Sequence, residues 1–149
     1  MVKDKLEIPF RLKDIENKQW AVFSENYDAE KPEFSLGFNS DFSIDTKHHV
    51  INIYPKVTLS QDEKTFMTIE TEFSFLIDDT GWKKMLKKNK FIIPKGFKEH
   101  MLVIAIGTLR GIIFEKTNSK NSVIKSFVLP AIDVRNGTGD DIIFELTEE

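Results

Sequence analysis

Apolar and polar residues alternate along three successive stretches of the chain between residues 34 and 77, as expected for strands with one buried face. Short polar turns separate the stretches, so they predict an antiparallel meander. One face of this sheet would be solvated, and the other would need a cover. The apolar positions are Phe34, Leu36, Phe38, Phe42 and Ile44, then Ile51, Ile53, Val57 and Leu59, then Met67, Ile69, Phe73, Phe75 and Ile77.

The preceding segment is less regular. Phe10 and Leu12 alternate with polar neighbours, as do Trp20 and Val22, which predicts a first strand that is interrupted near residues 16–18. Pro55 falls inside the second of the regular strands. Because proline cannot donate a ladder hydrogen bond, we expect an edge position or a bulge there.

One long helix is expected from Phe97 to Glu115, and it is apolar on nearly every side. Gly107 and Gly111 mark one side of it where another backbone could come close. One stripe suits packing on the sheet: Phe97, Met101, Ile104, Ala105, Thr108 and Ile112. A second stripe lies roughly 100° or more around the axis: Leu102, Ile106, Leu109 and Ile113.

A single sheet cannot cover both stripes, so we expect the second stripe to form an oligomer interface. A monomer could instead hide it under the apolar segment Phe127 to Val134. Asp78 to Thr80 could cap a short basic helix, Trp82 to Lys88, followed by a connector from Phe91 to Gly96. Residues Ile142 to Leu146 fit either one helical turn or a short strand.

These elements predict an α+β fold, a four-stranded antiparallel sheet covered on one face by a long helix. We expect a single domain over residues 1–149, with a flexible N-terminal arm at residues 1–9 and a short C-terminal segment at residues 136–149.

Composition narrows the function classes. The net charge is −3, so nucleic acid is a poor partner, and the absence of cysteine excludes disulfides and thiolate metal sites. The least polar stretch, Met101 to Phe114, is shorter than a bilayer span, and the N-terminus has no apolar secretory signal. We therefore expect a cytoplasmic protein without membrane insertion.

Residues that could carry chemistry are few. His48, His49 and His100 lack the further ligands that a metal needs, and Asp140 and Asp141 lack those of a calcium loop. A solvated turn or helix surface explains the histidines.

Glu70 and Glu72 lie about 6.6 Å apart on one strand face, within the range of paired catalytic carboxylates. A solvated sheet face explains them equally well. Arg110, inside the apolar helix, should pair with a carboxylate at an interface or reach to an edge. Without a nucleophile, phosphate or dinucleotide motif, the sequence predicts no enzyme, no metal and no cofactor.

The order of elements resembles that of the SecB-type export chaperones and their SecB-like relatives. The resemblance spans about residues 10–135. It begins with Phe10-Arg11-Leu12-Lys13-Asp14-Ile15, continues with Glu33-Phe34-Ser35-Leu36-Gly37-Phe38 and the meander through Phe73, and includes Phe127-Val128-Leu129-Pro130-Ala131-Ile132-Asp133-Val134 after the long helix.

The resemblance implies a dimer of dimers whose long helices meet, with Leu102, Ile106, Leu109 and Ile113 at the interface. It implies ATP-independent binding of unfolded polypeptides in an apolar groove formed by Trp20, Phe23, Tyr27, Phe127, Leu129 and Ile132. These six residues could equally close the core. It also implies a partner-docking sheet face at Glu70 and Glu72, although the flanks of Glu70 differ from the family pattern, which leaves docking to the export translocase open.

Three hypotheses follow. The first is an ATP-independent holdase for unfolded or partly folded polypeptides, acting in protein export or elsewhere. The second is an oligomeric SecB-like assembly module dedicated to one folded partner, such as an antitoxin or a mobile-element protein. The third, an enzyme that uses Glu70 or Glu72, serves as a contrast.

Overall fold

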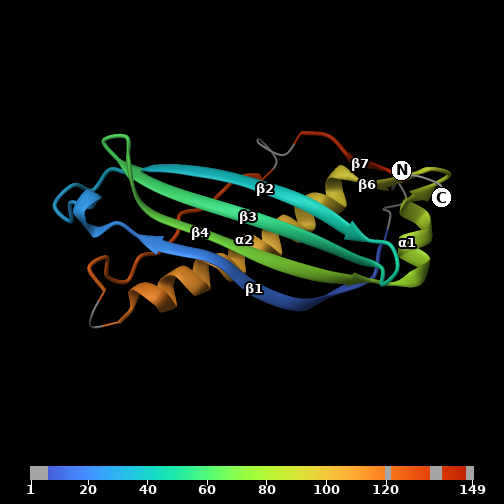
Figure 1. Ribbon diagram of the computed structural model, residues 1–149, viewed down its shortest axis with the longest axis horizontal. Helices are drawn as coiled ribbons and strands as arrows, with labels where there is room; N and C mark the ends of the chain where they lie inside the picture. The colour runs from blue at the N-terminus through green and yellow to red at the C-terminus, as the bar shows by residue number, and fades with distance from the viewer. Residues whose placement is uncertain (1–6, 120–121, 135–138, 147–149) are drawn as a thin grey trace, which may run out of the picture.

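A four-stranded antiparallel sheet runs the length of the molecule (Figure 1). The computed structural model describes residues 7–119, 122–134 and 139–146. The sheet consists of β1 (Phe10–Val22), β2 (Ser35–Asp45), β3 (Val50–Gln61) and β4 (Lys64–Ile77), in the spatial order β1-β4-β3-β2. The predicted four-stranded antiparallel sheet is confirmed, and β1 and β2 form its two edges.

The central strands alternate as the pattern predicts. Every predicted apolar position of β3 and β4 is buried, which places the core on one face of the sheet. The apolar residues of β2 lie on the same face but are only half-buried: Leu36, Phe38, Phe42 and Ile44. The edge strand β2 is therefore less well covered than the centre of the sheet.

Pro55 lies in β3, between β4 and β2, so the prediction of an edge position is wrong. No register shift occurs at Pro55 either; the register with β4 passes from Ile53↔Phe73 to Lys56↔Glu70 and skips Tyr54 and Pro55. The two pairs that are missing, those of Tyr54 and Pro55 with β4, would each need a backbone N–H from residue 55, which proline lacks. The skip thus shows that Pro55 turns its nitrogen toward β4.

This orientation fixes the direction of the neighbouring backbone groups. Along an antiparallel strand, successive residues alternate the side on which they bond. Since Pro55 is directed to β4, the even-numbered residues of β3 bond to β2. Their partners in β2 are the odd-numbered residues, as in Asp41↔Tyr54 and Asn39↔Lys56. The even-numbered residues of β2, including Ser40, therefore direct their N–H and C=O groups to the open edge.

The first strand is irregular, as predicted. Its register with β4 shifts between Leu12 and Asp14 and again between Asn17 and Gln19. The second shift coincides with the interruption predicted near residues 16–18.

The crossing loop from β1 to β2 contains a short 3₁₀ helix, η1 (Ser24–Asn26), and is fixed by one buried side chain. Gln61 Oε1 accepts a hydrogen bond from Asp28 N at 2.8 Å. Its Nε2 lies 3.2 Å from the carbonyl oxygens of Asp28 and Lys31 and 3.4 Å from that of Glu33. The Gln61 amide thus holds the loop against the β3–β4 hairpin, together with Asn26, which donates to the carbonyl of Thr65, and Lys31, which pairs with Asp62.

A second, three-stranded sheet follows the main one. Asp78 caps α1 (Asp79–Met85), and its carboxylate accepts hydrogen bonds from the backbone and hydroxyl of Thr80, which lower the pKa of Asp78. β5 (Leu86–Lys87), β6 (Lys90–Ile93) and β7 (Ile142–Glu145) then pair in that order. The connector predicted from Phe91 is wrong, because it holds β6. Of the two options for residues 142–146, the strand is correct.

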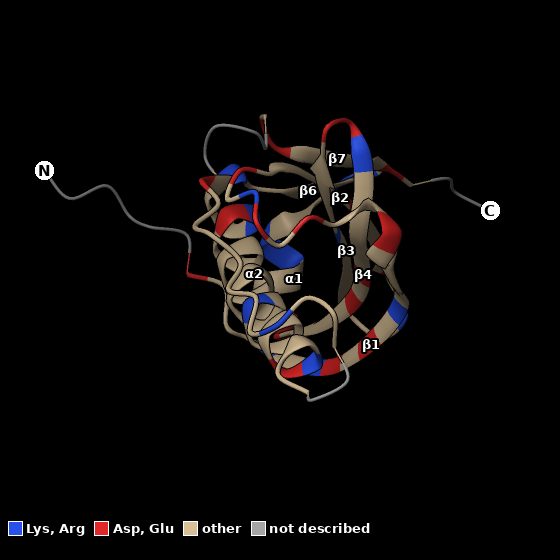
Figure 2. Ribbon diagram, turned by 90° about the vertical axis from the view of Figure 1, so that its left-hand side faces the viewer, with Lys and Arg blue, Asp and Glu red and all other residues tan. Residues whose placement is uncertain are grey.

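The long helix α2 (Lys95–Thr117) extends two residues beyond the prediction at each end. It lies on one side of the sheet and crosses the strands diagonally (Figures 1 and 2). Within the described residues, no helix is long and apolar enough to cross a membrane. Residues 1–6 of the predicted N-terminal arm, and residues 136–138 and 147–149 of the predicted C-terminal segment, lie outside the described residues.

Candidate functional site

The open edge of β2 is the most regular unpaired backbone that the structure describes. All eleven residues of β2 pair with β3 without a register shift. Among the described residues, no strand pairs with the other side of β2. An edge of this kind presents a row of free N–H and C=O groups that can bond to another extended chain.

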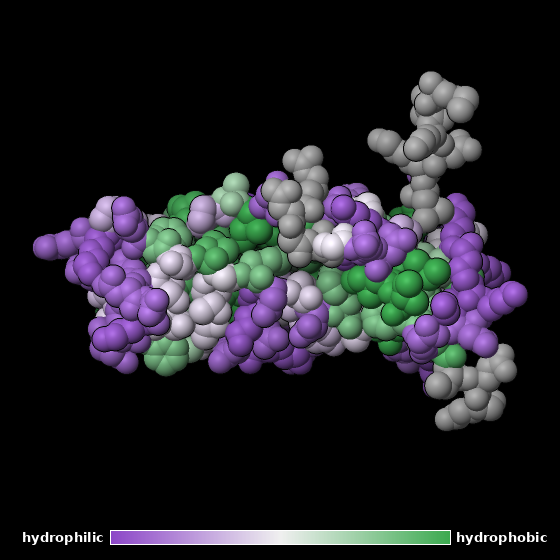
Figure 3. Space-filling model, turned by 90° about the horizontal axis from the view of Figure 1, so that it is seen from above, coloured by the Kyte–Doolittle hydropathy of each residue, from purple (hydrophilic) through white to green (hydrophobic). Residues whose placement is uncertain are grey.

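A groove lies beneath this edge. A cavity of about 490 Å³ is bounded by residues 38–42 of β2, by α2 and by the strand β7 with its leading loop. Its apolar lining consists of Phe38, Phe42, Leu102, Ile142 and Phe144. Seen from the β2 side, apolar surface gathers in patches along the length of the molecule, with polar residues around them (Figure 3). The edge thus combines free backbone groups with an apolar floor.

Polar residues also line the groove, namely Asn39, Ser40, Asp41, Lys98, Asp140 and Asp141. Ser40 shares the inner face with Phe38 and Phe42, and its buried Oγ has no hydrogen-bond partner among the described residues. Lys98 of α2 also lines the cavity, and its Nζ donates to the carbonyl oxygen of Asp140 at 2.6 Å. Burial lowers the pKa of the Lys98 amine.

The predicted groove residues divide into separate environments. Tyr27 and Phe127 flank the buried Phe66, with ring centroids 5.0 and 6.5 Å from it. Exposed Phe23 donates its backbone N–H to the carbonyl of Phe66 at 2.8 Å. Phe34, at the start of β2, contacts Phe127 at 5.3 Å. The structure therefore brings three of the six predicted residues together, at the end of the sheet where β2 begins.

The other three lie elsewhere. Trp20 is half-buried on β1, under the ammonium group of Lys116 at 5.3 Å. Leu129 is buried in the core, so it closes the core as the alternative interpretation held. Ile132 is half-buried against the core. Arg110 donates to the carbonyls of Leu129 and Pro130 at 2.8 and 3.3 Å, rather than to a carboxylate, which was one of its two predicted alternatives.

The predicted interface stripe is covered by the chain itself. Leu102, Ile106, Leu109 and Ile113 are at most 3% exposed, so they offer no surface to a second subunit. The helix α2 contacts β3 of the main sheet, and the hydrogen bonds from Arg110 hold residues 129–130 along its side. The stripe predicted to pack on the sheet is less buried than the predicted interface stripe, since Ile104, Thr108 and Ile112 are only half-buried. The exposed side of α2 carries Val103, Gly107, Gly111 and Phe114 instead.

The outer sheet face is a hydrogen-bonded network. Glu72 lies 3.0 Å from Lys18 Nζ and accepts a hydrogen bond from the Tyr54 hydroxyl at 3.3 Å. Glu70 pairs in register with Lys56. Because Lys18 pairs with Glu72 and Lys56 lies opposite Glu70 in the register, the face predicted for partner docking carries basic as well as acidic groups.

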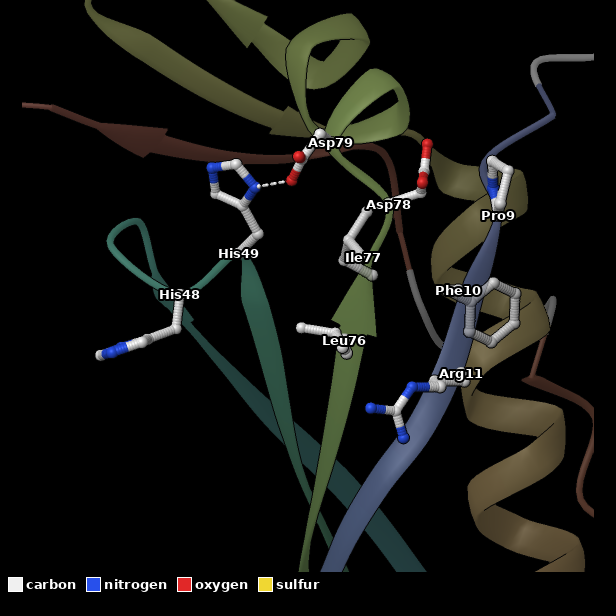
Figure 4. A pocket seen from close by; sticks show the side chains of 9 residues that line it. All are labelled: Pro9, Phe10, Arg11, His48, His49, Leu76, Ile77, Asp78 and Asp79. Carbon is white, nitrogen blue, oxygen red and sulfur yellow. Dashed lines mark hydrogen bonds and ion pairs between the residues drawn. The ribbon is translucent and has the colours of Figure 1, made fainter.

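The histidines occupy the far end of the sheet. His49 Nδ1 lies 2.8 Å from Asp79 Oδ1 (Figure 4). The His49 ring also stacks on Trp82, with 4.8 Å between the ring centroids. The adjoining cavity of about 360 Å³ also contains His48 and Arg11. Among the described residues, no group of three or more His, Cys, Asp or Glu could hold a metal. Asp141 Oδ1 accepts from Lys95 N at 2.8 Å, so this residue caps α2.

The sequence analysis missed the importance of β2 as an edge. Its alternation was visible, but the spatial order of the strands decides which strand is left open. Phe38 and Phe42 were assigned to the core, whereas the structure leaves them half-exposed over a cavity. Ser40, a polar residue on the apolar face, was the one local signal that could have been used.

Comparison with known proteins identifies a similarity to a solved structure. No family model matches the chain, and no curated protein matches it. Among solved structures it is similar to a Mycobacterium tuberculosis protein, the Rv1957 SecB-like chaperone in complex with a ChAD peptide from the Rv1956 HigA1 antitoxin. The TM-score is 0.48 and the identity 15%, over 83% of this chain and 91% of that one. At this level of similarity, function must be inferred from the chain's own surfaces.

Proposed function

We propose that this protein binds extended, apolar segments of other polypeptides by adding them to the open edge of β2. The observation that carries the proposal is the regular, unpaired edge of β2 above an apolar groove. The backbone of a bound segment would bond to the even-numbered residues of β2. Its alternate side chains would enter the groove beside Phe38 and Phe42.

This mode of binding suits an ATP-independent chaperone. Backbone hydrogen bonds do not depend on the client sequence, and a groove of aromatic and aliphatic side chains accepts many apolar residues. Phe34 and Phe127, whose rings lie 5.3 Å apart, prolong the apolar surface past the start of β2. No step in this function requires a cofactor or covalent chemistry, and we expect no enzymatic activity.

A matched pair of substitutions at Ser40 tests the proposal. Ser40→Pro removes an N–H from the open edge and leaves the bonds from β2 to β3 intact, since even-numbered residues do not bond to β3. Ser40→Ala keeps the N–H and serves as the control. The probe is a fluorescent peptide of strand length that alternates apolar and polar residues, titrated by anisotropy.

We expect Ser40→Pro to weaken peptide binding by about fivefold, because one edge hydrogen bond of about 1 kcal/mol is lost. Ser40→Ala should bind like the wild type. If Ser40→Pro binds the peptide as tightly as the wild type and its circular dichroism spectrum is unchanged, the peptide binds at a site other than the edge of β2. Absence of binding by the wild type would refute the function itself.

A second measurement separates the holdase from a module dedicated to one partner. A general holdase should suppress aggregation of an unrelated denatured protein at a stoichiometric ratio. If the peptide binds but aggregation proceeds unchanged, the dedicated module is favoured. The same assay with Ser40→Pro shows whether the β2 edge is responsible.

A further inference from the structure

Another cavity lies where the start of β1 meets the start of α2. Its volume is about 730 Å³, which is within the range of sites that bind small molecules. Its apolar lining comes from two separate segments, with Ile8, Pro9 and Phe10 on one side and Pro94 and Phe97 on the other. We infer that this cavity binds a small, neutral aromatic molecule that carries one hydrogen-bond donor, such as an indole or a phenol.

Three rings of the cavity are arranged to receive a further ring. Phe10 meets Phe97 edge-to-face, with ring centroids 5.1 Å apart and an interplanar angle of 82°. It meets His100 in the same way, at 5.3 Å and 89°. Aromatic rings favour edge-to-face and offset-stacked contacts. Because Phe10 stands nearly perpendicular to both neighbours, a planar ligand in this corner can stack on one ring and meet another edge-on.

The polar groups of the cavity define the rest of the ligand. Among the described residues that line it, only Glu7 and His100 have polar side chains. A ring nitrogen of a neutral imidazole can accept a hydrogen bond, so His100 suits a ligand with an N–H or O–H group. The carboxylate of Glu7 is exposed, and its negative charge disfavours an anionic ligand. A neutral ring with one donor therefore matches the cavity in shape and in charge.

Both walls of the cavity are held in place by the fold. Asp78 N donates to the carbonyl of Pro9 at 2.9 Å. Ile8 packs closely on α1, since a Cβ built on Gly81 would lie only 2.7 Å from Ile8 Cγ2. On the opposite wall, Lys98 N donates to the carbonyl of Pro94 at 2.9 Å. Walls that are already ordered lower the cost of binding a ligand.

The cavity is separate from the groove beneath β2. Gly96 and His100 are four residues apart and share one face of α2. Lys98 and Leu102 line the groove, and they share the opposite face of the same helical turns. A ligand in the cavity and a client on β2 can therefore bind at the same time. The inference does not rest on the proposed function.

Gly96 offers a substitution that fills the cavity. A Cβ built on Gly96 would meet no further atom within 4 Å among the described residues, so Gly96→Leu can place its side chain in the open space. Leucine also favours a helix more than glycine does, so this variant should fold at least as well as the wild type. Gly107→Leu is the matched control, because Gly107 is in the same helix, is open in the same way and does not line the cavity.

Titration calorimetry of the full chain with indole measures the binding. We expect Gly96→Leu to weaken indole binding by at least about tenfold, because the leucine side chain occupies the space of the ring, and Gly107→Leu to leave it unchanged. A wild type that does not bind indole overturns the inference. Binding by Gly96→Leu that is as tight as that of the wild type overturns it as well.

A comparison of two ligands tests the hydrogen bond. His100→Phe keeps an aromatic ring but removes its nitrogen atoms, so it should weaken indole binding by about fivefold. Naphthalene has no donor, and its binding should be the same in His100→Phe and the wild type. An equal loss for both ligands would contradict the assignment of a donor to the ligand.

Competition with the labelled peptide tests the separation of the two sites. The peptide should not displace indole, because the cavity and the groove lie on opposite sides of α2. Displacement would make the cavity part of the client site and overturn the inference of a separate ligand site. Indole binding without peptide binding would refute only the proposed function, and peptide binding without indole binding would refute only this inference.

Discussion

The two edges of the sheet are built differently. β1 pairs with β4 in a register that shifts twice, and five of its thirteen residues are charged. β2 pairs with β3 without a shift, and only Asp41 and Asp45 are charged among its eleven residues. Shifts and charges make an edge a poor template for a further strand, whereas a regular edge is a good one. Of these two edges, the contrast favours β2 as the one proposed to receive a partner.

The inner faces of the two edges differ as well. Below β2 lies the cavity lined by Phe38 and Phe42. The inner side of β1 packs against other parts of the chain, since the ring centroid of Phe10 lies 5.7 Å from that of Phe75 and 5.1 Å from that of Phe97. A segment added to β2 would find an apolar floor.

The largest effect is expected when the crossing loop that precedes β2 is detached from the β3–β4 hairpin. Gln61→Ala removes the amide that holds the crossing loop, and we expect a loss of about 2 kcal/mol in the free energy of unfolding. Urea denaturation measures it, with the exposed hairpin residue Lys64→Ala as a control that should change little. An unchanged stability for Gln61→Ala would show that the loop is held by other contacts.

A smaller effect is expected at the other end of β2. Hydrogen bonds from the His48 side chain and backbone lower the pKa of Asp45, so its carboxylate stabilises the fold above its ordinary pKa. This contribution is lost as the pH falls through the folded-state pKa. Asp45→Asn should therefore lower the urea midpoint at neutral pH, and the difference from the wild type should shrink in acid. A difference independent of pH would contradict the linkage.

The smallest effect is expected on β1. Lys13 has no partner residue on β4 because it falls at a register shift, so Lys13→Pro acts where the ladder is already interrupted. Peptide affinity should stay within about twofold of the wild type in the anisotropy assay. If Lys13→Pro weakens binding as much as Ser40→Pro, both edges bind peptide and the contrast fails.

Much of the main sheet could be predicted because alternation is a local property. Burial of Ile53 and Phe73 follows from a pattern within their own strands. The small sheet could not be predicted, since β6 and β7 are four residues each and carry no alternation that a periodicity could reveal. Pro55 misled the analysis because a proline disturbs only one side of a strand, and the side cannot be known before the neighbours are.

The candidate site was only partly predictable for a related reason. Tyr27 and Phe127 were expected to meet, and both contact Phe66. The stripe of Leu102 and Ile106 was assigned to a partner because a helical wheel shows apolar sides without showing what covers them. Which strand edge stays open depends on the order β1-β4-β3-β2, a property of the assembled sheet.

The irregularity of β1 also limits how far such sheets can grow. A protein with two regular edges could add copy after copy and form a filament. In this chain β2 is regular, whereas β1 has two register shifts and five charged residues. The shifts after Leu12 and Asn17 therefore disfavour filament growth by successive strand pairing, even though the edge of β2 is open.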